Sequence, residues 1–154
     1  MEESTRAFVT QRAGGRCEYC QCPADHSPSD FAVEHVYPRA RGGTDASDNL
    51  AYACQGCNNR KFTATTARDL LTDLVVTLFD PRRDHWHDHW HDHFQWSADG
   101  REIIGKTATG RATVERLQLN REAIVNLRIA LVAIGKHPPA GTAAVGRPEE
   151  TGEP

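Results

Sequence analysis

Two cysteine pairs constrain this chain more than any other feature of its sequence. Cys17 with Cys20, and Cys54 with Cys57, both have the Cys-x-x-Cys spacing. Four thiolates grouped in this way form the closed tetrahedral site that a structural zinc ion requires. The 33 residues between Cys20 and Cys54 exceed the roughly 15–20 residues of a simple zinc ribbon. We therefore expect a zinc-stapled fold with a further segment inserted between its two halves.

Length and composition indicate a small protein that depends on such a staple. With 154 residues and 38% hydrophobic content, the chain is expected to form either one domain or one small domain with an extension, and to have a limited core. A structural zinc ion would supply part of the stability that a small core lacks. The net charge of −3 excludes nucleic-acid binding by bulk electrostatics alone, so any electropositive surface must be local.

The sequence also predicts a cytoplasmic protein. Its N-terminal residues lack the apolar core of a secretory signal, and no apolar run approaches the length of a membrane span. In a reducing compartment, paired cysteines favour metal binding over disulfides. Cys22 is the fifth cysteine, and we expect it outside the coordination sphere because four ligands already complete a tetrahedron.

Apolar periodicity, glycines and prolines predict the secondary structure. The apolar stretch 70–78 is ambiguous, since it could end a helix or form a buried strand. Asn120 is a plausible N-cap of the last helix. The expected elements are a helix over 6–13, a strand over 31–36, a helix from 58 into 71, a hairpin within 96–105, and helices over 113–119 and 121–134.

The segment between the cysteine pairs carries a recognisable set of residues. Residues 34–43 (EHVYPRARGG), 48–50 (DNL) and 53–61 (ACQGCNNRK) follow one another in order. Together with the cysteines, they resemble the HNH endonuclease family, in its zinc-knuckle subgroup, over about residues 12–62. Asn58 stands where many members have histidine, which makes this the HNN version. Glu34 stands where many relatives have aspartate.

The resemblance implies a ββα-metal finger that cleaves DNA phosphodiester bonds with the help of one divalent cation, Mg²⁺ or Mn²⁺. His35 is then the general base, because an imidazole titrates near neutral pH. Glu34 and Asn58 offer oxygen ligands to the catalytic cation. Asn49 is expected to fix the loop and to orient His35, and it counts with His35 and Asn58 among the catalytic residues. No organic cofactor is expected.

Four basic residues flank this proposed site: Arg39, Arg41, Arg60 and Lys61. Each is a candidate for a phosphate contact with DNA. Solvated surface charge is the alternative for any one of them. Lys61 is the strongest candidate, because relatives of this kind often carry lysine just after the second cysteine pair.

A second resemblance covers the C-terminal part of the chain. Its residues look like the C-terminal extension of a bacterial subgroup of HNH proteins. The matching positions are 79–82, 90, 93–94, 96, 105, 110–113 and 119–121. This comparison implies that the extension completes the core and shapes a nucleic-acid groove.

Residues 84–95 form a tandem four-residue repeat, beginning Asp-His-Trp-His. A period of four satisfies both a helix, with its aromatic residues in one stripe, and a strand, with its histidines on one face. Such a tract could bind metal or stack on bases. We favour the plainer interpretation, a repeat expansion whose aromatic residues pack on the core.

The sequence therefore predicts an α+β protein: a zinc-stapled ββα-metal finger followed by a β-hairpin and a helical extension. We expect the finger over 1–66, the extension over 67–135 and a disordered tail over 136–154, because the last residues are rich in Pro, Gly and Glu. The predicted function is an HNH endonuclease, a phosphodiester hydrolase acting on DNA. The alternatives are a non-catalytic zinc module that binds nucleic acid or a protein, and metal buffering by the histidine tract.

Overall fold

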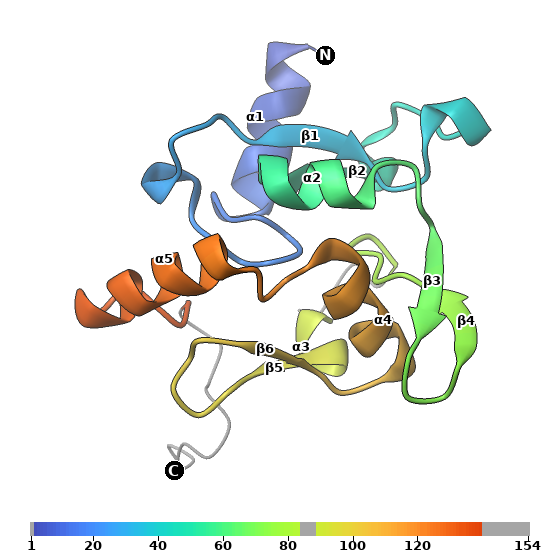
Figure 1. Ribbon diagram of the computed structural model, residues 1–154. Coiled ribbons are helices and arrows are strands. Elements are labelled where there is room, and N and C mark those ends of the chain that lie inside the picture. Colours follow the sequence, from blue (N-terminus) through green and yellow to red (C-terminus); the bar gives the residue numbers. More distant parts are fainter. Residues whose placement is uncertain (1, 84–88, 140–154) are drawn as a thin grey trace, which may run out of the picture.

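The N-terminal half forms the expected finger. The computed structural model describes residues 2–83 and 89–139. Helix α1 (Glu3–Arg12) precedes the antiparallel strands β1 (Ala32–His35) and β2 (Leu50–Ala53), and helix α2 (Gln55–Lys61) follows them. Figure 1 shows α2 lying across the β1–β2 pair, with α1 behind it. Helix, strand and small two-stranded sheets together confirm the α+β class.

Helix α2 is short because both of its ends are fixed locally. At its start, the Sγ atom of Cys54 accepts a hydrogen bond from the backbone N–H of Cys57 at 3.4 Å. At its end, Phe62 adopts a left-handed φ of 51°, which a residue with a side chain seldom does. The predicted continuation of this helix into residue 71 is therefore wrong.

A β-hairpin takes the place of that continuation. Strand β3 (Thr66–Asp69) pairs with β4 (Leu74–Thr77) in an antiparallel register. The ambiguous apolar stretch is thus a strand, but it is not buried: Leu74 and Val75 are 62% and 63% exposed. The carboxylate of Asp69 on β3 binds the guanidinium of Arg111 through two hydrogen bonds of 2.9 and 3.0 Å, and Thr77 O on β4 accepts from Thr109 Oγ1 at 2.9 Å.

The extension contains the other predicted elements, with shifted bounds. Its elements are α3 (Trp90–His93), β5 (Phe94–Trp96), β6 (Ile103–Gly105), α4 (Ala108–Leu117) and α5 (Glu122–Ala133). Helix α4 begins earlier than predicted, because the Oγ1 atom of Thr107 caps it by accepting from Gly110 N–H at 3.0 Å. Asn120 is not the N-cap of α5, since its amide binds the backbone of Ile103 at 2.7 and 2.9 Å instead.

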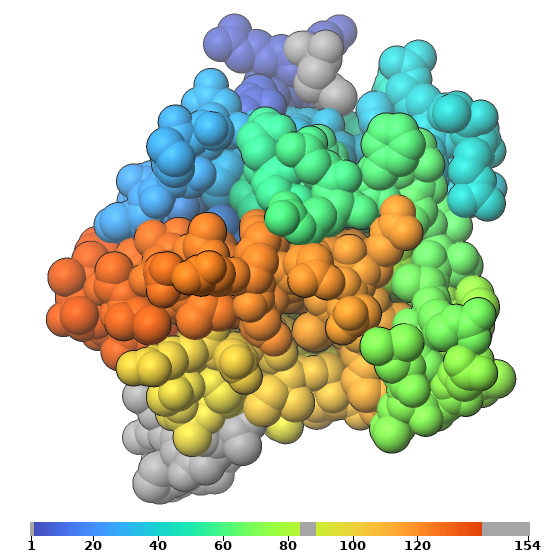
Figure 2. Space-filling view, in the orientation of Figure 1, coloured from blue at the N-terminus to red at the C-terminus, as the bar shows by residue number. Residues whose placement is uncertain are grey.

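One hydrophobic core crosses from the finger into the extension. Trp90, Phe94 and Trp96 are buried with the residues of the cysteine region. The indole Nε1 of Trp90 donates to the backbone oxygen of Tyr19, between two of the cysteines, at 3.0 Å. In Figure 2, α4 and α5 form a continuous band against α2. The aromatic residues of the repeat that fall in the described part pack on the core as favoured; residues 84–88 lie outside it.

The end of the described chain is anchored. His137 is 7% exposed and stacks edge-on against Trp96, with ring centroids 4.4 Å apart. The predicted tail thus includes a packed part at residues 137–139, and its remainder after residue 139 lies outside the described residues. Among the helices that the structure describes, none is long and apolar enough to cross a membrane.

Candidate active site and metal centre

The four paired cysteines converge on one point inside the finger. Their Sγ atoms all lie within 4.8 Å of one another, and each side chain is buried. The Sγ atoms of Cys20 and Cys54 are 3.7 Å apart, close to the about 3.8 Å that a zinc tetrahedron with 2.3 Å bonds requires. An all-thiol donor set suits zinc. These four residues are placed to bind a metal ion, as predicted for structural zinc.

The surroundings of the cysteines favour bound thiolates. Backbone N–H groups point at two of the sulfurs: Tyr19 and Cys20 donate to Cys17 Sγ, and Cys57 donates to Cys54 Sγ, at 3.4 Å each. Burial raises the pKa of the Cys17 thiol well above its ordinary value, so a cation is needed among the sulfurs to hold them ionised. Cys22 is buried nearby but is not part of the four-cysteine cluster.

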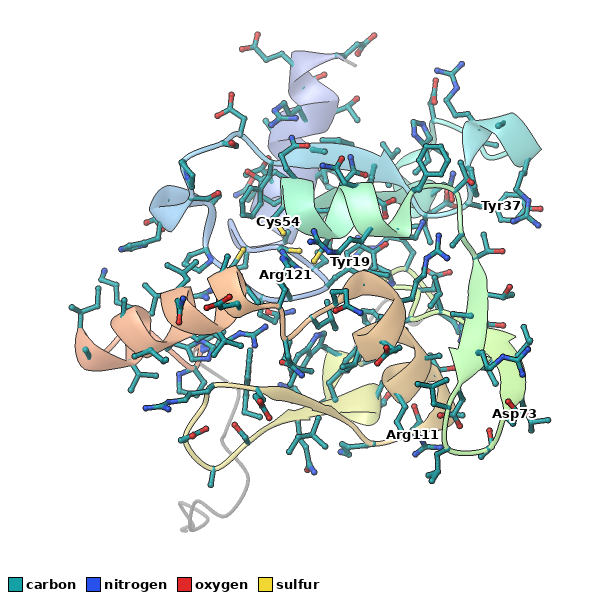
Figure 3. All side chains as sticks on the ribbon, in the orientation of Figure 1. Tyr19, Tyr37, Cys54, Asp73, Arg111 and Arg121 are labelled. Atoms are coloured by element: carbon teal, nitrogen blue, oxygen red, sulfur yellow. The ribbon has the colours of Figure 1, made fainter. Side chains whose placement is uncertain are left out.

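Arg121 adds a positive charge beside this cluster from the extension. Its Nη2 lies 3.4 Å from Cys54 Sγ and its Nη1 lies 3.8 Å from Cys57 Sγ. Burial lowers the pKa of Arg121, but the neighbouring cysteine thiolates together raise this pKa by a larger amount. The net shift of the pKa is therefore upward. Figure 3 shows Arg121, Cys54 and Tyr19 gathered at the centre of the molecule. A zinc ion bound by four thiolates carries net negative charge, which this guanidinium offsets.

His35 lies at the opposite end of β1 from the segment that leads out of the first cysteine pair. Its side chain is 20% exposed, and its Nε2 lies 2.8 Å from the Oδ1 atom of Asp45. Arg39 lies on the other side of that carboxylate, with Nε 3.7 Å from Oδ1. The hydrogen bond to His35, aided by Arg39, holds the pKa of Asp45 below its ordinary value.

Asn49 holds the loop between His35 and β2 in place. Its Oδ1 accepts from Tyr37 N–H at 2.9 Å, and its Nδ2 donates to the backbone oxygens of Tyr37 and Thr44 at 3.0 and 2.9 Å. The backbone of Asn49 also accepts from Val36 N–H at 2.9 Å. The asparagine side chain therefore holds the loop that follows His35 through the backbone atoms of that loop.

Glu34 points to the other face of β1, into the core. It is 5% exposed, and its Oε2 accepts a hydrogen bond from the Tyr19 hydroxyl. Its Oε1 faces Lys61 Nζ at 3.3 Å, and that ammonium also donates to Val36 O at 2.9 Å. Burial raises the pKa of Glu34, while Lys61 and Tyr19 act in the opposite direction. The structure thus pairs two predicted site residues, Glu34 and Lys61, with each other.

Asn58 shares a helix face with Lys61. Residues three apart on a helix are neighbours, and Lys61 faces Glu34 on β1. Asn58 is half-buried on the same side of α2, directly after the Cys57 ligand. The second cysteine pair therefore fixes the helix that carries both residues.

The predicted phosphate-contacting residues fall into two groups. Arg39, Arg41 and Arg60 are exposed, and Arg41 donates to Thr65 Oγ1 at 3.0 Å. Lys61 is only 2% exposed, so its ammonium organises the interior of the site and does not face solvent.

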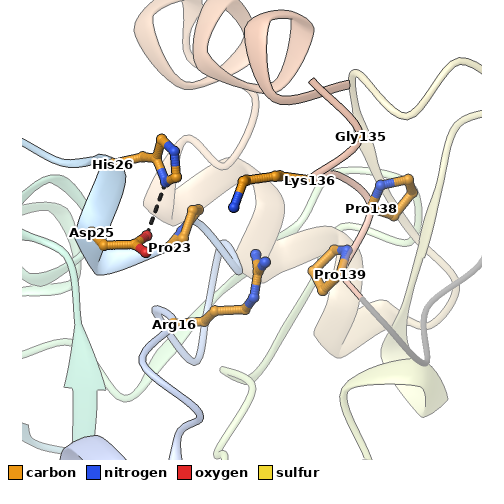
Figure 4. A pocket seen from close by; sticks show the side chains of 8 residues that line it. All are labelled: Arg16, Pro23, Asp25, His26, Gly135, Lys136, Pro138 and Pro139. Atoms are coloured by element: carbon orange, nitrogen blue, oxygen red, sulfur yellow. Dashed lines mark hydrogen bonds and ion pairs between the residues drawn. The ribbon is translucent and has the colours of Figure 1, made fainter. Parts of the chain in front are cut away.

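A concavity on another part of the surface contains none of the predicted site residues. It has a volume of about 260 Å³ and lies between η1 (Ala24–His26) and the segment after α5. Figure 4 shows Arg16 and Lys136 pointing into it, opposite an Asp25–His26 pair joined at 2.9 Å.

Three residues of these sites were not predicted from the sequence. Asp45 is ten positions from His35, and nothing in its neighbourhood marks it as a histidine partner. Tyr19 stands between two cysteines, where an aromatic residue is expected to pack and not to bind a carboxylate. Arg121 is 64 positions from Cys57, and only the fold brings the two together.

Comparison with known proteins agrees with this geometry. Residues 17–63 match a family model described as HNH endonuclease. No curated protein and no solved structure matches the chain significantly. The matched segment contains both cysteine pairs, the β1–β2 pair and α2, together with His35, Asn49 and Asn58. Residues 17–63 of this chain are therefore similar to an HNH endonuclease domain.

Proposed function

We propose that the protein is a metal-dependent endonuclease that hydrolyses DNA phosphodiester bonds. The observation that carries this proposal is the partly exposed His35, held by Asp45 at the end of β1 within the segment that matches the HNH model. The HNH domain implies a nucleic-acid substrate. Its buried thiols are best kept reduced in the cytoplasm, where we place the protein.

His35 acts as the general base in this proposal. The Asp45 carboxylate accepts a hydrogen bond from the Nε2–H group of His35. The lone pair on His35 Nδ1 is then left to take the proton from an attacking water. The imidazolium formed in this way is stabilised by the Asp45 carboxylate on its other side. Asn49 keeps the loop that carries Asp45 in place.

Glu34 and Asn58 would hold the divalent cation, Mg²⁺ or Mn²⁺. Their carboxylate and carboxamide oxygens fit the preference of a hard cation. When bound, the cation supplies positive charge to the scissile phosphate and the leaving oxygen. Both oxygens of Glu34 are engaged in the structure, so binding requires Lys61 to release the carboxylate. Lys61 then keeps its contact with Val36 O.

Exposed arginines would hold the DNA backbone. Arg39 and Arg41 lie on the loop after His35, and Arg60 lies on α2. Guanidinium groups bind phosphate oxygens in a bidentate manner, which positions a duplex without reading its sequence.

A plasmid assay tests this proposal. Purified protein is incubated with supercoiled plasmid and Mg²⁺ or Mn²⁺, and nicked and linear products are measured on gels. We expect cleavage by the wild type and a loss of about 100-fold or more in His35→Ala, as for removal of a general base. His26→Ala is the matched control, because His26 also binds an aspartate but lies in η1, outside the site. Equal cleavage by wild type and His35→Ala would falsify the assignment of the base.

The second candidate function is a non-catalytic zinc module that binds nucleic acid. The pairing of Glu34 with Lys61 favours it, because that pairing occupies the carboxylate that a catalytic cation would use. It predicts that DNA is retained in a gel-shift assay with no nicking under any divalent cation.

A further inference from the structure

We propose that Asp45 is a positioning residue that fixes the tautomer and the orientation of His35. The inference rests on the proposed nuclease function, in which His35 is the base. Its foundation is the 2.8 Å contact between His35 Nε2 and Asp45 Oδ1. A carboxylate can only accept hydrogen bonds, so this contact places the proton on Nε2 and leaves Nδ1 free to accept one.

The loop that carries Asp45 is held rigidly enough for such a role. Gly43 N–H donates to Pro38 O at 2.9 Å. A Cβ atom at Gly43 would lie 1.8 Å from Tyr37 O, so only glycine allows the loop to fold back this closely. Asn49 Nδ2 then binds Thr44 O at 2.9 Å, directly before Asp45. Two hydrogen bonds and the close approach at Gly43 thus fix the backbone next to the carboxylate.

Arg39 supports the ionised form of Asp45 from the solvent side. Its Nε lies 3.7 Å from the same Oδ1 atom that binds His35. A cation here keeps the carboxylate an acceptor. The His35 side chain is 20% exposed and Asp45 is 63% exposed, so the histidine is the more confined partner and the aspartate approaches it from outside. In this arrangement the base, His35, is oriented by a partner that lies nearer to solvent, Asp45.

The test compares three variants at Asp45 and Asp48 by kinetics. Asp45→Ala removes the acceptor, Asp45→Asn keeps one acceptor oxygen, and Asp48→Ala removes an exposed carboxylate of the same loop region. We expect kcat for plasmid nicking to fall about 10- to 100-fold in Asp45→Ala, with KM changed less than about twofold. Asp45→Asn should retain a larger part of the activity, and Asp48→Ala should match the wild type. Equal zinc content and thermal midpoints establish that the variants are folded.

A spectroscopic readout decides the question without any cleavage. In protein labelled with ¹⁵N at histidine, the ring-nitrogen shifts of His35 report which nitrogen carries the proton. We expect the Nε2–H form in the wild type and a mixture of tautomers in Asp45→Ala. Unchanged His35 shifts in Asp45→Ala would overturn the proposal, and so would a changed tautomer with unchanged kcat. If the wild type does not cleave DNA, the proposed function fails and the shifts alone decide the role of Asp45.

Discussion

At the scale of single residues, the interior of the finger contains a buried ion pair. Glu34 and Lys61 are 5% and 2% exposed, respectively, and they join β1 to α2. Two ions removed from water are tolerated only when they are paired and hydrogen-bonded. Tyr19 and Val36 O supply the remaining partners. The pair therefore links the first cysteine pair, the strand that carries His35, and the helix that carries Asn58.

Lys61→Met should be strongly destabilising, because it leaves Glu34 buried with Tyr19 as its remaining side-chain partner. We expect the free energy of unfolding to fall by about 3 kcal/mol, measured by denaturant titration with zinc in excess. The double variant Glu34→Gln/Lys61→Met should recover part of that loss, because no charge is then left unpaired. A double variant whose loss equals the sum of both single losses would show that the two residues are not coupled.

At the scale of elements, the sequence predicted those segments whose signals are local. The glycines that end α1, the strand before the loop and the hairpin turn at Gly100 all act within a few residues. The prediction of a helix from 58 to 71 was wrong because the helix ends at Phe62. This residue has a left-handed φ, which the sequence around it does not indicate. The hairpin that replaces it is held by the bond between Asp69 and Arg111, 42 positions apart. The four cysteines were predicted because their spacing marks them in the sequence itself. The contact of Asp45 with His35 was not predicted, because it depends on how the loop after His35 folds back.

The segment after α5 should make stability depend on pH through His137. Burial lowers the pKa of His137, aided by the charge of Arg128, although the bond from its Nε2 to Gly100 O at 2.8 Å acts the other way. Below about pH 6.5 the unfolded chain then binds a proton that the folded chain does not. The free energy of unfolding should therefore fall as pH drops from about 7.5 to 5.5.

Replacement of His137 isolates this contribution from other titrating groups. His137→Phe should be less stable than the wild type at pH 7.5 and should lose less stability on acidification, measured by denaturant titration at each pH with zinc in excess. Parallel pH profiles for the two proteins would contradict the assignment. His26→Phe, at a histidine for which burial is only partial, serves as the control.

At the scale of the whole molecule, finger and extension share one core. Trp90 of the extension donates a hydrogen bond to the backbone oxygen of Tyr19 in the finger, and the side chain of Arg82 forms an ion pair with that of Glu18. Contacts of this kind are expected to make unfolding cooperative. We therefore expect the parts on either side of the predicted boundary at residue 66 to unfold together.

Removal of zinc should disturb the extension as well as the finger. Trp90 and Trp96 both lie outside the matched domain, yet they pack in the shared core. A chelator should therefore red-shift tryptophan emission in step with metal release, because metal binding supplies folding free energy. Re-addition of zinc should reverse the shift. Metal release with unchanged emission would show that the extension is stable by itself.

The position of Arg121 also bears on how this finger can be used outside its own chain. The guanidinium that offsets the charge of the thiolates comes from the junction of α4 and α5, far beyond the last cysteine. A graft that carried only residues 17–63 into another protein would leave those sulfurs without their cationic neighbour. We therefore expect the segment that matches the HNH model to need either the extension or a substitute cation in the host protein.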